Sequence, residues 1–286
     1  SVAAEREELR RWQPLGGGSN HTWPERLVIN EFRPADDLHA EMCRKLAAIC
    51  RHACMNVPYY RQLFMDRGLG PDAVNTPEDL LALPVLCKQD IQRHGVSMVS
   101  ELHPENGRLV MHRSSGTTGR PVDVWMSPRS YQMFTILWQR QARWFRFDPA
   151  QTIAKIRRST QLPFREDGSP NPDGATTRRP RWQYVGNLFE TGPEIGFNST
   201  NAAEQQVAWL REHRPAYLMS YPSILEELAL AAGCACPVDS LQSVVGISTG
   251  ANDALRSSIE RHYGIPFHQS YGLNEIGLIA TRCEAG

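Results

Sequence analysis

Beyond residue 200 the sequence alternates between short apolar runs and amphipathic helical patterns, and this rhythm constrains the fold more than any other feature. Strands joined by helices run parallel in one sheet, and ligands bind such sheets at the carboxyl ends of the strands. The loops that begin at Tyr221, Gly250 and Tyr271 leave predicted strands, so we expect them to line a binding site. The predicted strands are residues 216–220, 243–248 and 266–270.

Residues 113–121 read Arg-Ser-Ser-Gly-Thr-Thr-Gly-Arg-Pro, between predicted strands at residues 108–112 and 122–126. Glycines let a backbone approach a ligand closely, while hydroxyls and successive amides can bind phosphate. The segment therefore predicts a hairpin loop that binds the phosphates of a nucleotide, with a ligand-free turn as the alternative. It has neither the lysine nor the following helix of a Walker P-loop, which argues against a Walker-type nucleotide hydrolase.

The same loop resembles the signature loop of the adenylate-forming enzymes, a superfamily of acyl-CoA synthetases, adenylation domains and luciferases. Residues 271–275, Tyr-Gly-Leu-Asn-Glu, are similar to the Tyr-Gly-x-Thr-Glu motif of that superfamily. Further segments resemble the phenylacetate–coenzyme A ligase branch and occur in its order. These are residues 57–61, 83–90, 221–223 and 250–252. The resemblance covers residues 40–286.

The resemblance implies an α/β fold, in which a helical N-terminal region packs on the mixed, partly parallel sheet of an adenylate-forming large domain. We predict a mainly helical region over residues 1–100 and an α/β region that binds ATP and the acyl group over residues 101–286. Family members continue with a ribose-binding aspartate and a small C-terminal domain that carries a catalytic lysine. This chain has no such segments, so we expect it to be part of a longer protein, weakly active or inactive alone.

The reaction that the resemblance implies joins a carboxylic acid to the α-phosphate of ATP, releases pyrophosphate and passes the acyl group to coenzyme A. The expected acid is an aryl acid or another small organic acid, and Mg²⁺ is an expected cofactor. Transfer to a carrier-protein thiol or to an amine is one alternative. A non-catalytic module that binds nucleotide or acyl groups is another.

The resemblance also assigns roles to individual residues. Thr118 and Glu275 are the implied catalytic residues, and Glu275 would hold Mg²⁺, which prefers oxygen ligands. Asn274 replaces the usual Thr or Ser that touches the α-phosphate, although its amide can still donate a hydrogen bond. The implied nucleotide contacts are Ser114, Ser115, Gly116, Thr117, Thr118, Gly119, Gly250, Ala251, Asn252, Tyr271, Gly272 and Asn274. The implied acid contacts are Tyr221, Pro222, Ser248, Gly272 and Leu273.

The seven cysteines, with no visible secretory signal, favour reduced thiols in the cytoplasm. Cys43, Cys50 and Cys54 follow one helical stripe and are predicted to lie in the core. Cys283 resembles a cysteine that relatives use as one ligand of a structural Zn²⁺, although the other ligands would lie beyond residue 286.

The composition excludes some classes of partner. With 31 basic and 31 acidic residues the net charge is zero, so we expect no nucleic-acid binding through a general positive field. No apolar run is long enough for a transmembrane helix, so we expect no membrane partner. The expected partners are the acid, ATP, and coenzyme A or a carrier protein, and a homodimer remains open.

Two segments are predicted to be irregular. Residues 1–35 read as an arm, and residues 157–181 read as a charged, solvated loop, with contact between its arginines and a polyphosphate as the alternative. His112 and His268 flank the expected site and are predicted to be structural, because an ionised acid needs no general base.

Overall fold

The computed structural model describes residues 1–15, 22–102, 109–113, 122–165, 167–248, 250–273 and 276–281. The chain divides into two compact units. The first comprises Ser1–Arg26 and Phe134–Gly286, and the second comprises Leu27–Met133. The predicted division into residues 1–100 and 101–286 stays a prediction. Among the helices that the structure describes, none is long and apolar enough to cross a membrane.

The first unit is built on a seven-stranded sheet in the order β4-β5-β3-β6-β7-β8-β9. The five inner strands run parallel, while β4 and β9 pair antiparallel at the two edges. This mixed, partly parallel sheet confirms the predicted fold class. The strands are β3 (Ile153–Arg157), β4 (Thr177–Arg179), β5 (Glu194–Asn198), β6 (Tyr217–Ser220), β7 (Ser243–Gly246), β8 (Phe267–Leu273) and β9 (Gly277–Thr281).

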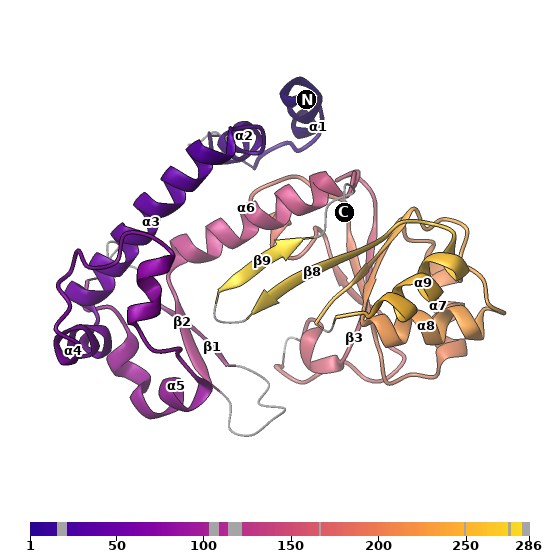
Figure 1. Cartoon of the computed structure of the whole chain (residues 1–286). Coiled ribbons are helices and arrows are strands. Elements are labelled where there is room, and N and C mark those ends of the chain that lie inside the picture. The colour runs from indigo at the N-terminus through magenta and orange to yellow at the C-terminus, as the bar shows by residue number, and fades with distance from the viewer. Residues whose placement is uncertain are drawn as a thin grey trace. The chain divides into compact units, whose positions relative to one another are not determined.

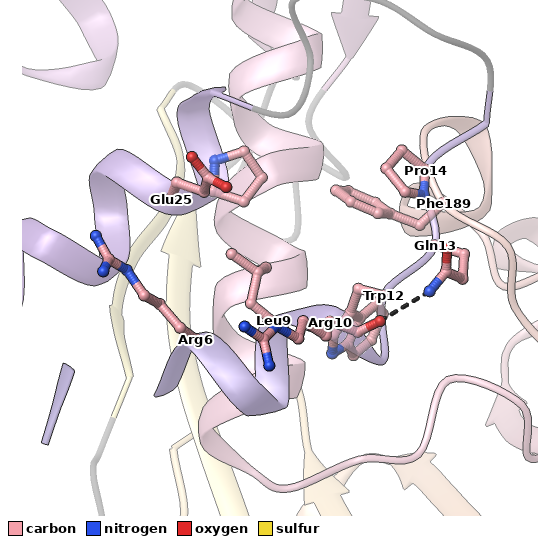
Figure 2. Close-up of a pocket in the computed structure, with 9 residues that line it drawn as sticks. Arg6, Leu9, Arg10, Trp12, Gln13, Pro14, Glu25 and Phe189 are labelled. Atoms are coloured by element: carbon pink, nitrogen blue, oxygen red, sulfur yellow. Dashed lines mark hydrogen bonds between the residues drawn. The ribbon is translucent and has the colours of Figure 1, made fainter. Parts of the chain in front are cut away.

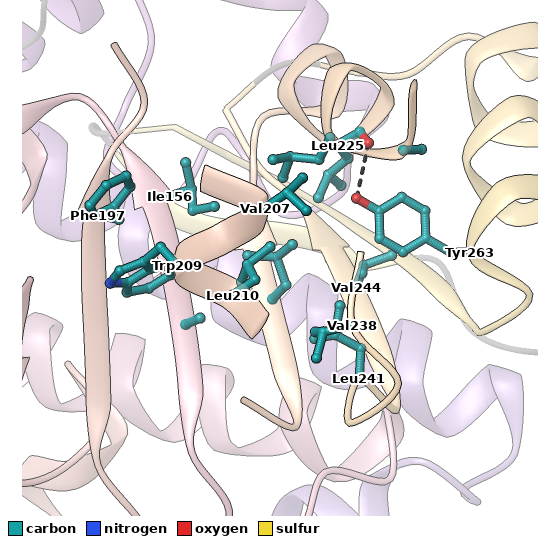
Figure 3. Packing of buried hydrophobic residues seen from close by; sticks show 14 of the residues in the cluster. Ile156, Phe197, Val207, Trp209, Leu210, Leu225, Val238, Leu241, Val244 and Tyr263 are labelled. Carbon is teal, nitrogen blue, oxygen red and sulfur yellow. Dashed lines mark hydrogen bonds between the residues drawn. The ribbon is translucent and has the colours of Figure 1, made fainter. Parts of the chain in front are cut away.

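Three helices cover one face of this sheet: α7 (Ala203–His213), α8 (Pro222–Ala231) and α9 (Asp253–Tyr263). Figure 1 shows them together on one side of the strands. Apolar side chains from the helices and strands fill the space between the layers, as Figure 3 shows for Ile156, Leu210 and Val244. The Tyr263 hydroxyl donates to the Leu225 carbonyl at 2.9 Å, which satisfies its polar group in this core.

The other face of the sheet is more aromatic. Phe147 stacks on Tyr217 with ring centroids 3.9 Å apart, and Trp182 meets both rings edge-on. Lys155 of β3 also points to this layer and forms a buried ion pair with Glu194 of β5 at 2.8 Å. Burial lowers the pKa of Lys155, and Glu194 opposes that shift. The part of α6 (Pro128–Trp144) from Phe134 onward belongs to this unit, and Ala142 near its end joins the aromatic cluster.

The prediction of an irregular arm over residues 1–35 is wrong, because α1 (Val2–Arg10) and α2 (Thr22–Asn30) form there. Glu5 of α1 is buried, and it forms ion pairs with Arg143 and, at 2.9 Å, with Arg146. The Trp12 side chain is buried, with 3% of its surface exposed, and it meets the rings of Trp182 and Phe189 edge-on. These partners are more than a hundred residues away in sequence, so local patterns did not indicate that the segment is ordered.

The second unit contains helices and one small sheet. Its core holds Cys50, Phe64 and Val74, whereas Cys43 and Cys54 are only partly buried, so the predicted cysteine stripe is confirmed in full only at Cys50. The elements are α3 (Ala35–Asn56), α4 (Pro58–Asp66), η2 (Glu78–Ala82), α5 (Lys88–His94), η3 (Gly95–Met98), β1 (Val110–Arg113) and β2 (Asp123–Met126).

Strands β1 and β2 pair antiparallel, with Arg113 opposite Asp123, which confirms the predicted hairpin. The residues that join them, 114–121, lie outside the described residues. Three further strands, β3, β4 and β5, were not predicted from the sequence. Of these, β4 lies inside the segment 157–181 that was predicted to be loop, as does the short helix η4 (Ser159–Gln161). Another short helix, η5 (Val185–Asn187), follows that segment.

Candidate functional site

The carboxyl ends of β3, β6, β7 and β8 meet at one edge of the sheet, because these strands are parallel neighbours. Tyr221 directly follows β6, Ser248 lies two residues after β7, and Tyr271 lies near the end of β8. The predicted binding loops therefore do share one edge of the sheet. Ligand-binding roles for these residues stay predictions.

Arg157, the last residue of β3, links two of these loops. Its Nη2 donates to Ser248 Oγ at 3.1 Å, and its guanidinium carbon lies 5.9 Å from the centroid of the Tyr221 ring. The Tyr221 hydroxyl donates in turn to Gln161 Oε1. We call Arg157, Gln161, Tyr221 and Ser248 the edge cluster. The prediction of a solvated loop is wrong for Arg157, because it is the last residue of β3 and its side chain contacts residues in the loops that follow β6 and β7.

Ser248 has a left-handed backbone conformation, with φ of +67°. A residue other than glycine costs about 1–3 kcal/mol in such a conformation, and residues of this kind concentrate at functional sites. The strain sets the path of the chain just after β7, and it brings the hydroxyl within reach of Arg157. Sequence reasoning selected Ser248 by resemblance alone, since nothing in its neighbours indicated a positive φ.

The loop after β7 leaves room beside its backbone. Among the described residues, no heavy atom would lie within 4 Å of a Cβ built on Gly250, so another molecule can approach this position. Asn252 has a structural task as well, because its Oδ1 accepts a hydrogen bond from the Leu255 amide at 2.9 Å and caps α9. A nucleotide contact by Asn252 would therefore involve its amide nitrogen or its backbone.

The hairpin of β8 and β9 presents Tyr271 and Leu273, which are 59% and 41% exposed. A flat, accessible ring at Tyr271 is what stacking on a base requires. Gly272 has a packing reason of its own, because a Cβ there would lie 2.8 Å from the carbonyl oxygen of Gly277. The glycine thus allows the close β8–β9 pairing, next to a bulge at Tyr271 and Gly272.

An aromatic group lies on the α6 side of the sheet. The rings of Phe134 and Tyr184 meet edge-on at 5.1 Å, Trp138 stacks on Tyr184 at 6.3 Å, and the Lys155 ammonium lies 5.6 Å from the Tyr184 ring centroid. Phe134 also packs against Gly277, where a Cβ would lie 2.8 Å from its ring. The sequence indicated apolar packing for α6, and Tyr184 was missed because its φ of +71° and its partners are tertiary features.

His268 of β8 is stacked on Phe145 with ring centroids 3.9 Å apart. Burial lowers the pKa of this imidazole to about 4, and the nearby Arg256 adds to the shift. A neutral, enclosed histidine of this kind fits the predicted structural role. His112 lies in β1, paired with Val124.

Several predicted site residues lie outside the described residues, namely Ser114, Ser115, Gly116, Thr117, Thr118, Gly119, Asn274, Glu275 and Cys283. Their roles in binding phosphate, Mg²⁺ or Zn²⁺ stay predictions. Within the described ranges, no three His, Cys, Asp or Glu side chains gather in a way that could hold a metal ion.

A separate hollow of about 670 Å³ lies between α1, the start of α2 and Phe189 in the first unit. Figure 2 shows Leu9, Trp12 and Phe189 around it, with Arg6 and Arg10 from α1. None of the predicted binding residues lines this hollow, so we do not place the candidate site there.

Comparison with solved structures defines the class of fold. The chain superimposes on a 2-hydroxyisobutyryl-CoA ligase, crystallised with its acyl-adenylate and coenzyme A, with a TM-score of 0.64 and 18% identity. The match covers 85% of this chain and 50% of that one. The fold is therefore that of the adenylate-forming CoA ligases.

Sequence comparison identifies the nearer relatives. The chain is 27% identical over 256 residues to the phenylacetate–coenzyme A ligase of Escherichia coli, and 29% identical over 260 residues to that of Pseudomonas putida. Each match covers 86% of this chain, which spans about half the length of these relatives, at 53%. No family model matches the chain. The chain is thus related to the phenylacetate–coenzyme A ligases within the adenylate-forming enzymes.

Proposed function

We propose that this chain provides the ATP- and acid-binding part of an AMP-forming acid–coenzyme A ligase. The proposed reaction activates a carboxylic acid as an acyl-adenylate, releases pyrophosphate and then forms a thioester with coenzyme A. The observation that carries the proposal is the edge of the sheet, where the loops that resemble the ligases leave neighbouring parallel strands. Activity, substrates and partners of the whole protein are part of this proposal.

The first step brings two anions together, so positioning and charge neutralisation carry most of the work. In our proposal the hydroxyls and amides of residues 114–119 hold the β- and γ-phosphates, and Asn274 touches the α-phosphate. Tyr271 stacks on adenine, and Gly250 and Ala251 let the base approach their backbone, with open space beside Gly250 among the described residues. Glu275 would hold Mg²⁺, which supplies neutralisation of phosphate charge when bound.

The acid would lie against Tyr221, Pro222, Ser248, Gly272 and Leu273. The edge cluster supports this placement, since Arg157 joins the loops of Tyr221 and Ser248. An aryl acid suits the partly buried ring of Tyr221, although other small organic acids fit the same description. We propose coenzyme A as the acyl acceptor, because the sequence relatives are named as coenzyme A ligases. A carrier-protein thiol or an amine is the alternative acceptor.

A non-catalytic binding module is the rival proposal from another class. It gains support if no lysine of this chain can replace the catalytic lysine of the family. Lys155 lies close to the edge cluster, but its contacts make it unsuitable for that role. It is 5% exposed, pairs with Glu194 at 2.8 Å and donates to Gln183 at 3.0 Å. Moving it to a ligand would leave Glu194 buried without its main partner, which typically costs 3–5 kcal/mol.

Two measurements separate these proposals. Exchange of labelled pyrophosphate into ATP by the whole protein is followed with a panel of aryl and small aliphatic acids. Binding of a non-hydrolysable acyl-adenylate analogue is followed by calorimetry. Acid-dependent exchange supports the ligase. Binding of the analogue without exchange for any acid supports the module. If neither exchange nor binding is seen, both proposals are wrong.

A further inference from the structure

Arg157 places a positive charge at the ligand-binding edge of the sheet, and the described residues leave that charge without a carboxylate. Its Nε is enclosed and has no hydrogen-bond partner in the part of the chain that the structure describes. Its Nη2 donates to the neutral hydroxyl of Ser248 at 3.1 Å, and its guanidinium carbon lies over the Tyr221 ring, 5.9 Å from the centroid. A hydroxyl and a ring hold the guanidinium in place, but they do not neutralise it.

The contrast with Lys155, two residues earlier on the same strand, is informative. Both side chains lie on the same face of the sheet, since strand residues alternate. Lys155 has Glu194 at 2.8 Å, whereas none of the described ion pairs involves Arg157. Burial lowers the pKa of Lys155, and the charge of Arg157 adds to that shift. Around these two residues the positive charges therefore outnumber the paired carboxylates, and the unbalanced charge is that of Arg157 at the edge of the sheet.

An enclosed charge is costly unless it is paired, and a guanidinium pairs best with the two oxygens of a carboxylate or phosphate. We propose that Arg157 binds an oxyanion of the ligand, which is either the carboxylate of the acid or a phosphate of the nucleotide. Tyr221 is the platform on which the guanidinium lies, and Ser248 fixes its orientation. The identity of these ligands rests on the proposed function, whereas the need for an anion rests on the contacts of Arg157.

Two matched pairs of probes test the assignment on the 286-residue chain. AMP and adenosine differ in the phosphate, and phenylacetate and phenylacetamide differ in the carboxylate. Each probe is titrated by calorimetry into the unchanged chain, into Arg157→Gln and into Arg158→Gln. Arg158 is the matched control, because it is the next residue and is exposed.

We expect Arg157→Gln to weaken at least one anion about tenfold or more, which is the effect of losing a charge-assisted hydrogen bond. Its neutral counterpart should change less than twofold, and Arg158→Gln should change neither. A selective loss of AMP identifies the phosphate as the partner, and a selective loss of phenylacetate identifies the carboxylate. Arg157→Lys keeps the charge and should retain part of the affinity, and it serves as the test variant if Arg157→Gln does not fold.

The assignment is overturned if Arg157→Gln weakens an anion and its neutral counterpart alike, or if Arg158→Gln has the same effect. It is also overturned if neither anion binds the unchanged chain. These outcomes are separate from those of the ligase proposal, which depends on pyrophosphate exchange. Selective loss of an anion in the chain, together with no exchange by the whole protein, would retain Arg157 as an anion site and remove the ligase proposal.

Discussion

We predict that the buried ion pair between Glu5 and Arg143 contributes most to the packing of α1 in the first unit. The Arg143 side chain is 1% exposed and that of Glu5 is 10% exposed, so water cannot replace either partner. Glu5→Gln keeps the shape of the side chain and removes its charge. Breaking a buried pair from one side typically costs about 3–5 kcal/mol, and here the Arg143 charge would lose its Glu5 carboxylate. Since Arg146 also loses its contact at 2.9 Å but is half exposed, we expect a loss of about 3 kcal/mol.

Urea unfolding followed by tryptophan fluorescence measures this loss. Every tryptophan except Trp125 lies in the first unit, so the signal reports mainly on the unit that contains α1. Glu7→Gln is the matched control on the same helix, because its pair with Arg10 is 72% and 77% exposed and should contribute less than about 0.5 kcal/mol. The reasoning is refuted if Glu5→Gln lowers the free energy of unfolding no more than Glu7→Gln does.

Two further predictions concern β8. The pKa of His268 is lowered to about 4 in the folded chain, so the unfolded chain binds the proton more readily and stability should fall as the pH drops from 6.5 towards 4. His268→Phe keeps the stack on Phe145 and should flatten that part of the urea-midpoint profile, and an unchanged profile would count against it. Gly272→Ala should lower the free energy of unfolding by about 1–3 kcal/mol, because its Cβ would lie 2.8 Å from the Gly277 carbonyl oxygen. Gly250→Ala is the control, because a Cβ there would meet none of the described residues within 4 Å, and equal effects in the two variants would contradict the packing argument.

The parallel part of the sheet was predictable because its signals are local. Strands β6, β7 and β8 are short apolar runs, and the helices between them have recognisable starts, such as Pro222 and the Asn252 cap. The loops after these strands are also the segments that resemble the ligases. The sequence therefore indicated both the fold class and the edge of the sheet at which a ligand is expected to bind.

The missed elements depend on partners that are distant in sequence. β3 carries Lys155 and Arg157, which look like surface residues until Glu194 of β5 and Ser248 are brought beside them. Helix α1 is highly charged, and its burial depends on Arg143. Charged residues in an interior can be recognised only when their counter-charges or ligands are placed, and one sequence does not place them.

Titration of a non-hydrolysable aryl acyl-adenylate analogue tests the central claim most directly. The claim predicts saturable binding of this analogue to the unchanged chain. Binding of ATP, which carries the β- and γ-phosphates, should lose about 1–3 kcal/mol when Thr117 and Thr118 are both replaced by alanine, because their hydroxyls would hold those phosphates. The melting temperature of each variant, measured without ligand, shows that folding is intact. Equal ATP affinity of the double variant would contradict the phosphate-loop assignment. Absence of binding to the unchanged chain would contradict the claim that this sheet edge is an acyl-adenylate site.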